Sequence, residues 1–562
     1  MLTPASLLTG AVALALGVAT APIRPGSAPG AEAPRCRPGQ RDTVTIAATT
    51  DAHGRVRGWD YYENRPDTVR GLTRAATIVD SVRRAHPGGL VLVDAGDLLQ
   101  GNPFAYVAAR VTRQKKNPII AAMNSMRYDA AVIGNHEFNY GVPYLNASIA
   151  QARFPFLAAN VYRTSGAPAY AATTIVRRRG VNIGIVGGTT PGSSLWDADN
   201  LKKAGLRVSD IIPAARAGVE RVRSRGADVV VLVLHSGLNE PSSYDTVSTG
   251  IGSENVAARA AAEVPAINVL AYGHSHKENG GEVIGRTLLI QPKNWATSVA
   301  IATVPLTCNA RGSGWTAATA SGTLVQSARR VQDAGVLHAS EQVHRETIAY
   351  ATAPIGSTPV LWSADSARMI DTPLIDFILE VERKAANADL ASTAAFDLKA
   401  RLGPGAINVA QAAQLYPYDN TLRAVRISGA QLRAYLDYSS QYYKTTQRGD
   451  LVTDTAIGGY NFDVVSGVDY TLDVSRPPGQ RVATLTFHGK PVAPADSFTL
   501  ALNNYRQTGG GGYAMLRGAR VVYDRQQEIR QLLIDEIRRR KVILPSEYFV
   551  RNWAFVQPTV AR

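Results

Sequence analysis

The stretch Val229-Val230-Val231-Leu232-Val233-Leu234, followed at once by His235-Ser236-Gly237, shows the pattern that decides the fold of the 562-residue chain. An uninterrupted apolar run of this length, rich in valine, is typical of a buried strand. Short runs of the same kind recur between residues 42 and 305, at Val44–Ala48, Leu90–Val93, Ala130–Ile133, Ile183–Val186, Val269–Tyr272 and Leu288–Ile290. Several intervening segments have helical amphipathic spacing, namely Gly71–Ala85, Ile119–Met126 and Asp210–Arg225. This alternation predicts a layered α/β domain.

The rest of the chain predicts a second domain, which a helix joins to the first. From Asp333 to Ala353 apolar residues recur at helical spacing, and the pattern ends at Pro354. We therefore expect a first domain over 42–328, a connecting helix within 329–356 and a second α/β domain over 357–562. The predicted elements of the second domain are the helices Pro373–Ala385, Gln431–Gln441 and Asp524–Arg540 and the strands Val482–Phe487 and Phe498–Leu502.

The N-terminal segment is expected to direct export. Leu7–Val18 is apolar and is followed by Ala19-Thr20-Ala21, which is typical of a signal peptide over residues 1–21. The apolar segment is too short to span a bilayer, so no stable membrane insertion is expected. Residues 22–41 are rich in Pro, Gly and Ala and are predicted to be a linker. The mature protein is therefore expected in the periplasm or outside the cell.

Composition and charge exclude several classes of protein. With 45% hydrophobic and 19% charged residues the chain is globular and not disordered as a whole. The net charge is +15, but the basic residues are mostly arginines spread singly, so no nucleic acid polymer is expected as a partner. A basic surface would instead steer a phosphate-bearing substrate. Two cysteines are too few for a disulfide-stapled scaffold or a cysteine-rich metal site. The sequence leaves the oligomeric state open.

Polar side chains able to bind metal follow five predicted strands of the first domain. The segments are Thr49-Thr50-Asp51-Ala52-His53, Asp94-Ala95-Gly96-Asp97, Gly134-Asn135-His136-Glu137, Leu234-His235-Ser236-Gly237 and Gly273-His274-Ser275-His276. Because the carboxyl ends of strands in an α/β sheet meet at one crevice, we expect one site. Imidazole, carboxylate and amide ligands without thiolate suit Zn, Mn, Fe or Co. There are too many candidate ligands for one tetrahedral ion, which favours two divalent metal ions sharing a carboxylate.

The ordered set of motifs resembles that of the calcineurin-like metallophosphoesterases. In the second domain, Leu415–Thr421 and Asn503–Arg506 resemble the C-terminal substrate-binding domain of the 5′-nucleotidase family. Gly96–Gly101, Asn135–Gly141 and Tyr460–Val464 are similar to the bacterial 2′,3′-cyclic-nucleotide 2′-phosphodiesterase/3′-nucleotidase branch. The resemblance implies an N-terminal metallophosphoesterase domain, a C-terminal nucleotide-binding domain and two-metal hydrolysis of a nucleotide substrate.

The resemblance also implies a role for each site residue. One ion would be held by Asp51, His53 and His276, and the other by Asn135, His235 and His274, with Asp97 bridging both. His136 matches the catalytic histidine of the family. Asn139 stands where 5′-nucleotidases have the aspartate that pairs with this histidine, so it is a candidate orienting partner. Tyr418 and Tyr505 match the two aromatic residues that hold the nucleobase.

Three functions stay open at this point. The resemblance favours an exported 2′,3′-cyclic-nucleotide 2′-phosphodiesterase/3′-nucleotidase. A 5′-nucleotidase or UDP-sugar hydrolase is disfavoured by two departures: Gly509–Gly512 replaces a Gly-Gly-Asp-Gly run, and Ser392–Arg401 has no Asn-Gly-Gly-Gly-x-Arg motif. A secreted nucleotide-binding protein without turnover is the third reading, which the intact set of metal ligands disfavours.

The two cysteines allow two alternatives. Cys36 precedes the first predicted strand and Cys308 follows a late strand of the same domain, so the two could meet. Export would favour a disulfide between them. Because Cys36 lies in a predicted linker, two free thiols are an equal alternative.

Overall fold

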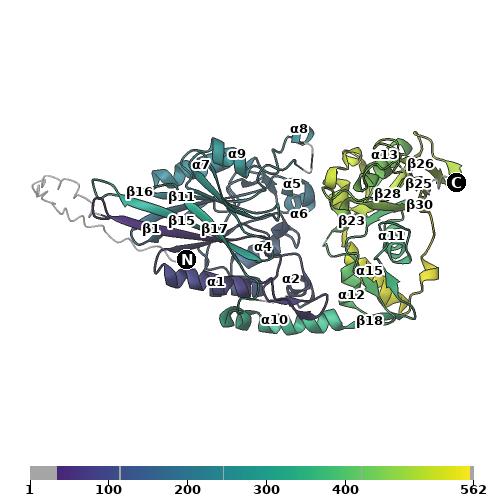
Figure 1. Ribbon diagram of the computed structural model, residues 1–562, viewed down its shortest axis with the longest axis horizontal. Helices are drawn as coiled ribbons and strands as arrows, with labels where there is room; N and C mark the ends of the chain where they lie inside the picture. Colours follow the sequence, from purple (N-terminus) through teal and green to yellow (C-terminus); the bar gives the residue numbers. More distant parts are fainter. Residues whose placement is uncertain are drawn as a thin grey trace, which may run out of the picture.

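The computed structural model describes residues 35–112, 116–242, 244, 246–418, 420–447 and 449–556. It has two domains, which helix α10 (Ala334–Thr352) joins along one edge of the molecule (Figure 1). The predicted signal peptide 1–21 and residues 22–34 of the predicted linker lie outside the described residues. Within the described ranges, no helix combines the length and the apolar character that crossing a bilayer requires.

Two sheets form the centre of the first domain. One contains, in spatial order, β16 (Trp315–Ala317), β15 (Ser298–Cys308), β1 (Arg41–Thr49), β4 (Leu90–Asp94), β5 (Ala130–Val132) and β6 (Phe156–Leu157), and β17 (Ser321–Gln326) also pairs with β15. The other contains β13 (Asn279–Ile284), β14 (Thr287–Gln291), β12 (Val269–Tyr272), β11 (Val229–His235), β9 (Val181–Thr189) and β8 (Thr173–Arg178). The strands from β1 to β6 in the first sheet and from β14 to β9 in the second are parallel to their neighbours.

The sheets and helices of this domain form four layers. Alternate residues of both sheets, such as Val44, Ile46 and Val231, form a buried core between the sheets. The outer face of the first sheet is covered by α1 (Leu72–Ala85), α3 (Pro118–Met126) and α10, and that of the second by α7 (Ile211–Ser224) and α9 (Ala257–Glu263). The predicted layered α/β domain is therefore confirmed.

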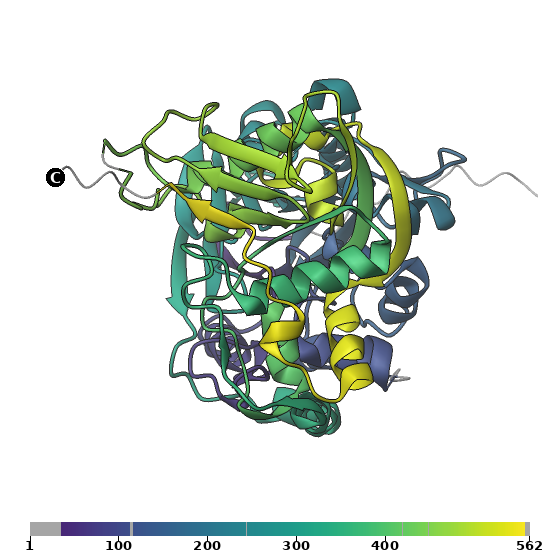
Figure 2. The same cartoon turned by 90° about the vertical axis from the view of Figure 1, so that its right-hand side faces the viewer.

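The second domain is also α/β, as predicted (Figure 2). Its larger sheet has the order β24 (Asp463–Ser466), β20 (Leu390–Ala394), β28 (Ser497–Asn503), β23 (Thr421–Ser428) and β29 (Arg520–Glu528). A smaller sheet contains β27 (Lys490–Pro491), β26 (Val482–Phe487), β25 (Asp469–Leu472) and β30 (Trp553–Phe555). One hydrophobic core joins these strands to α11 (Pro373–Ala386), α12 (Val409–Leu415), α13 (Gly429–Ser439) and α15 (Ile529–Arg540).

The connecting helix begins and ends where the sequence predicts. Asp333 caps α10, because its Oδ1 accepts a hydrogen bond of 2.9 Å from the backbone N–H of Val336. The helix stops before Pro354, which cannot continue it. The domain limits 42–328, 329–356 and 357–562 stay a prediction.

The predicted helix Asp524–Arg540 is wrong over its first residues. Residues up to Glu528 belong to β29, and α15 starts only at Ile529. In β29, Asp524 is the partner of Arg423 on β23. Pairing with a strand about 100 residues earlier in the chain overrides the local pattern, which no window of sequence around residue 524 reveals.

The two cysteines form a disulfide. Cys36 and Cys308 are bonded and both are buried. The preceding Arg35 pairs with Asp228, and the backbone N–H of Cys308 donates to the carbonyl of Gln40. The part of the predicted linker 22–41 that the structure describes is therefore held against the first domain, and the alternative of two free thiols is wrong for this structure.

Candidate active site

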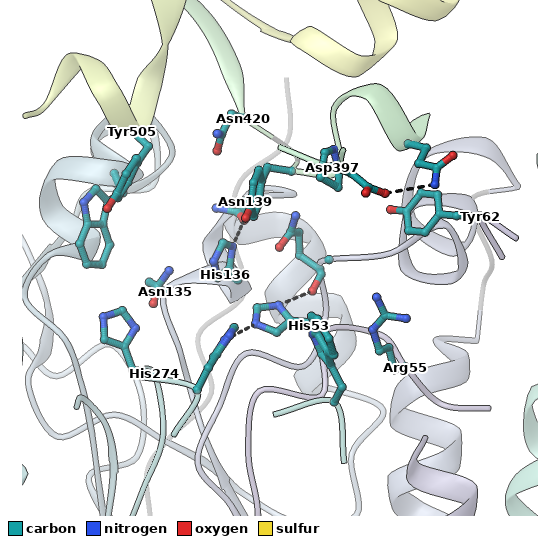
Figure 3. Close-up of a pocket in the computed structure, with 18 of the residues that line it drawn as sticks. His53, Arg55, Tyr62, Asn135, His136, Asn139, His274, Asp397, Asn420 and Tyr505 are labelled. Carbon is teal, nitrogen blue, oxygen red and sulfur yellow. Dashed lines mark hydrogen bonds between the residues drawn. The ribbon is translucent and has the colours of Figure 1, made fainter. Parts of the chain in front are cut away.

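The predicted ligand segments meet at one edge of the two packed sheets. They follow β1 (Asp51, His53), β4 (Asp97) and β5 (Asn135, His136) in the first sheet, and they end or follow β11 (His235) and β12 (His274, His276) in the second. Each of these strands runs parallel to a neighbour, so its carboxyl end lies at the same edge. The structure places the side chains of all eight residues close together, and Figure 3 shows four of them, His53, Asn135, His136 and His274.

The ligand atoms form clusters on both sides of Asp97. Ligand atoms within 4.8 Å of one another belong to Asp51, His53 and His276 in the first cluster and to Asp97, His235 and His274 in the second. A third group of the same kind, His53, Asp97 and His136, lies between them. Oδ2 of Asp97 lies 3.1 Å from Nε2 of His235 and 3.8 Å from Nε2 of His53. One carboxylate oxygen therefore faces both clusters.

Backbone conformation brings these side chains inward. Left-handed φ values between 47° and 74° occur at Asp51, His53, Asp97, His274 and His276. Such conformations cost about 1–3 kcal/mol each for residues other than glycine and concentrate at functional sites. Glycines make the close approach possible: a Cβ at Gly134 would lie 2.2 Å from Oδ1 of Asp97, and a Cβ at Gly101 would lie 2.6 Å from the Cβ of His53.

Backbone carbonyls orient two of the imidazoles. Nδ1 of His53 donates to the carbonyl of Gln100 at 3.0 Å, and Nδ1 of His235 donates to that of Ala95 at 2.8 Å. In both rings Nε2 is left facing the clusters, which is the tautomer that metal-binding histidines use. Burial lowers the pKa of His53 to about 3, so its lone pair is available at neutral pH.

The electrostatics of the carboxylates fit divalent cations. Burial by itself would raise the pKa of Asp97, but His235 and His136 hold this pKa well below its ordinary value. For Asp51, burial is likewise outweighed by His276, and the pKa is lowered. Ionised carboxylates, imidazole nitrogens and the amide oxygen of Asn135, which lies 3.0 Å from Nε2 of His235, form a donor set that fits two divalent ions.

Glu137 organises the loops that carry the site. Its buried carboxylate accepts hydrogen bonds of 2.6–3.0 Å from the backbone N–H groups of Asp97, Leu98, Leu99 and Gly134. Burial raises its pKa, although hydrogen bonds from Leu99 and Leu98 oppose this. Glu137 therefore ties the loop after β4 to the loop after β5.

A buried carboxylate lies behind His136 and was not predicted. Nδ1 of His136 donates to Oδ1 of Asn139 at 2.6 Å, and Nδ2 of Asn139 donates to both oxygens of Asp197 at 3.1 and 2.9 Å. Burial raises the pKa of Asp197 to about 6, although the hydrogen bond from Asn139 opposes this. An ionised carboxylate has acceptors and no donor. Asp197 therefore fixes the amide of Asn139 with its NH₂ group toward the carboxylate and its oxygen toward His136.

Two further residues surround His274. Oε1 of Glu254 lies 2.8 Å from Nε2 of His274, and the indole of Trp196 stacks on the imidazole at 5.7 Å between centroids. Neither Glu254 nor Asp197 lies in a motif that sequence reasoning could recognise. For Trp196 and Asp197 the sequence offers one indication of a place near the site: both follow β9, another parallel strand that ends at this edge.

The second domain supplies one wall of the site. A cavity of about 660 Å³ lies between the domains, and its lining includes Tyr418, Tyr505, Asn420 and Asn504 as well as the clusters. In Figure 3 Tyr505 lies above Asn135 and His274. The structure thus places both predicted aromatic residues on the cavity wall, and 46% of the Tyr418 surface is exposed.

A buried ion pair holds the segment of Tyr505 in place. Nε and Nη2 of Arg506 donate to the two oxygens of Asp463 at 2.8 and 2.9 Å. The guanidinium also lies 4.0 Å from the ring centroid of Tyr513. A bidentate pair of this kind has one geometry, so Tyr505 projects from a rigid support.

Comparisons with known families match the two domains separately. The calcineurin-like phosphoesterase family matches residues 44–278, and the 5′-nucleotidase C-terminal domain matches residues 352–518. A 2′,3′-cyclic-nucleotide 2′-phosphodiesterase/3′-nucleotidase from Haemophilus influenzae is 30% identical over 92% of this chain and 88% of its own length. The trifunctional nucleotide phosphoesterase YfkN from Bacillus subtilis is 29% identical over 91% of this chain, which spans only 39% of that protein.

Solved structures share the two-domain arrangement. A Staphylococcus aureus protein solved as a candidate 5′-nucleotidase superposes with a TM-score of 0.77 over 92% of this chain and 100% of its own, at 25% identity. A 5′-nucleotidase precursor from Thermus thermophilus gives a TM-score of 0.61 over 92% of this chain and 99% of its own, at 21% identity, and shows the fold alone.

Proposed function

The chain belongs to the family that joins a calcineurin-like phosphoesterase domain to a 5′-nucleotidase C-terminal domain, and from this premise we propose that it acts on 2′,3′-cyclic nucleotides and 3′-nucleotides. It is a metal-dependent phosphoester hydrolase. The observation that carries the proposal is the pair of clusters, with Asp97 facing both, in a cavity whose lining also includes Tyr418 and Tyr505. A nucleotide can then place its phosphate on the clusters and its base on the tyrosines.

The roles proposed for the site residues follow from their positions. Two divalent ions, when bound by Asp51, His53, Asp97, Asn135, His235, His274 and His276, supply charge that activates water and neutralises phosphoryl oxygens. His136 protonates the oxygen of the leaving group, while Asn139 and Asp197 hold its imidazole in place. With a cyclic substrate the bond from phosphorus to O2′ breaks and a 3′-nucleotide forms. Cleavage at O3′ then releases phosphate and the nucleoside.

The choice between cyclic or 3′ substrates and 5′ substrates is tested by a substrate panel. We expect kcat/KM to be higher for 2′,3′-cyclic AMP and 3′-AMP than for 5′-AMP, because discrimination depends on how the base-holding tyrosines turn the ribose toward the clusters. Phosphate release, with added phosphatase for the cyclic substrate, measures all three. A preference for 5′-AMP of about tenfold or more, equal to about 1.4 kcal/mol, would instead support the 5′-nucleotidase alternative.

Replacing Tyr418 or Tyr505 by Ala should weaken nucleotide binding. Stacking on an aromatic ring contributes about 1–3 kcal/mol per base, so KM for 3′-AMP should rise by about tenfold or more. Hydrolysis of p-nitrophenyl phosphate, which has no base, is the control and should change little. Equal losses on both substrates would show that the tyrosines support the fold and do not bind the base.

Export is proposed on independent grounds. The disulfide between Cys36 and Cys308 supports an oxidising compartment, such as the periplasm or the extracellular space. We therefore propose that residues 1–21 are removed during export and that the two cysteines are then oxidised. Edman sequencing and non-reducing mass spectrometry of the secreted protein would test both steps.

A further inference from the structure

Arg55 lines the same cavity, across His53 and His136 from Tyr505 (Figure 3). Arg55 follows His53 by two residues, and its guanidinium carbon lies 4.4 Å from the ring centroid of Trp295. In Figure 3 Arg55 and Tyr62 lie at one side of the cavity and Tyr505 and His274 at the other, with His53 and His136 between them. A ligand that reaches from Tyr505 across the clusters would therefore approach Arg55.

Arg55 is a cation without a carboxylate partner. Its neighbour Arg70, which lies over the same indole at 4.6 Å, pairs with Asp60 at 3.9 Å and Asp67 at 3.5 Å. Among the described residues, by contrast, no carboxylate oxygen lies within 4 Å of the Arg55 guanidinium, and its buried Nε has no hydrogen-bond acceptor. A half-buried cation without an acceptor is an unfavourable arrangement that a bound anion would relieve.

The carboxylates near Arg55 already have other partners. Asp60 accepts hydrogen bonds from the backbone N–H groups of Tyr62 and Glu63, and Glu63 pairs with Arg65. On the wall that the second domain supplies, Asp397 accepts from Gln414 and from the backbone of Lys399.

Lys399 adds a second positive charge from that wall. Its side chain lines the cavity, and within the described part of the chain its ammonium group makes no ion pair. Arg55 and Lys399 thus lie on different domains and border the same space. Because Asp60, Glu63 and Asp397 on the same walls already have partners, Arg55 and Lys399 are cations with which an anionic group of a ligand can pair.

The support beneath Arg55 is rigid and connected to the metal-binding loop. The backbone N–H of Trp295 donates to the carbonyl of Asp51 at 2.7 Å, and its carbonyl accepts from Gly71 at 3.1 Å. The indole restricts the guanidinium, whose planar donors match the geometry of a phosphate. The position of Arg55 relative to Asp51 is therefore defined by short contacts.

We propose that Arg55, with Lys399, binds a second phosphoryl group of the substrate while the phosphate to be cleaved lies on the clusters. This rests on the proposed function and names its substrate class: nucleotides with a second phosphate on the ribose. The second phosphate is carried on the ribose, as in adenosine 3′,5′-bisphosphate. In ADP the phosphate that is not cleaved lies between the clusters and the ribose, on the side of Tyr505.

Replacing Arg55 by Ala tests the proposal through a ratio of substrates. We expect kcat/KM for adenosine 3′,5′-bisphosphate to fall by about tenfold, while that for 3′-AMP stays within about twofold, as for loss of one charge-assisted hydrogen bond. ADP compared with 5′-AMP forms the second arm, and the ratio of their kcat/KM values should not change. A change of about tenfold in that ratio alone would overturn the assignment of Arg55 to a phosphate on the ribose. Arg55→Lys should retain part of the preference, because it keeps the charge without the planar donors.

The matched control is Arg207→Ala. Arg207 also lies over an aromatic ring, 5.0 Å from the centroid of Tyr162, but it does not line the cavity. It should leave all four rates unchanged. Equal losses on substrates with one and two phosphates would overturn the proposal and assign Arg55 to the cleaved phosphate, and unchanged rates on all four would overturn it too. If the wild-type enzyme cleaves no nucleotide, the proposed function is wrong, and the proposal for Arg55, which rests on it, is wrong as well.

Discussion

Replacing Asp97 by Asn is expected to remove metal from both clusters and to lower kcat on every substrate by about a hundredfold to a thousandfold. Oδ2 of Asp97 faces His235 and His53 at 3.1 and 3.8 Å, so the substitution removes negative charge at the point that both clusters share. Removing one partner of a buried charge pair costs about 3–5 kcal/mol. An amide oxygen still coordinates, but it cannot neutralise two dications.

Metal content and thermal stability test the bridging role of Asp97 independently of activity. The wild-type protein and the variant are dialysed, loaded with Zn or Mn, and compared by elemental analysis and by thermal unfolding with and without metal. Asp210→Asn is the control: Asp210 caps α7 by accepting a hydrogen bond from Ile212, and asparagine caps a helix equally well. An Asp97→Asn protein that keeps both ions and near-wild-type turnover would contradict the bridging role.

Much of the fold is predictable because local signals determine it. The strands Val269–Tyr272 and Val482–Phe487 have the predicted bounds, since turn residues or a charged residue flank each apolar run. Helix α10 begins after Asp333, which caps it, and stops before Pro354, which cannot continue it. Such signals lie within a few residues of the element that they define. The boundary between β29 and α15 does not, because the partner strand β23 determines it.

The same distinction applies to the site. Asp51, Asp97 and His235 could be anticipated because each lies at the end of an apolar strand or a few residues after it, and parallel strands end at one edge. Asp197 and Glu254 come from longer connections, where nothing in the neighbouring sequence indicates which side chain turns toward the site. The sequence places Arg55 two residues after His53. Only the folded chain shows that Asp60 and Asp67 pair with Arg70 and leave Arg55 without a carboxylate partner. Pairings between distant side chains need the folded chain.

Replacing His136 by Ala should lower kcat/KM for 3′-AMP by about 10²–10⁴-fold, the usual contribution of a general acid. The loss should be much smaller for p-nitrophenyl phosphate, because nitrophenolate leaves without being protonated. Asp197→Ala should show the same dependence on the leaving group with a smaller loss, about tenfold, because a hydrogen bond to a charged group contributes about 1.5–3 kcal/mol. Asp197 does not contact the substrate in this mechanism and acts as a positioning residue through Asn139.

A double-mutant cycle separates positioning from a purely structural role. If Asp197 acts through His136, then Asp197→Ala should change the rate on 3′-AMP little once His136 is already Ala, since there is no imidazole left to orient. Asp197→Asn keeps an acceptor for Nδ2 of Asn139 and should recover part of the activity, whereas a residue needed only for folding would show equal losses on both substrates. Losses that multiply in the double variant would show that Asp197 and His136 act separately, and the chain from His136 through Asn139 to Asp197 would then have no part in catalysis.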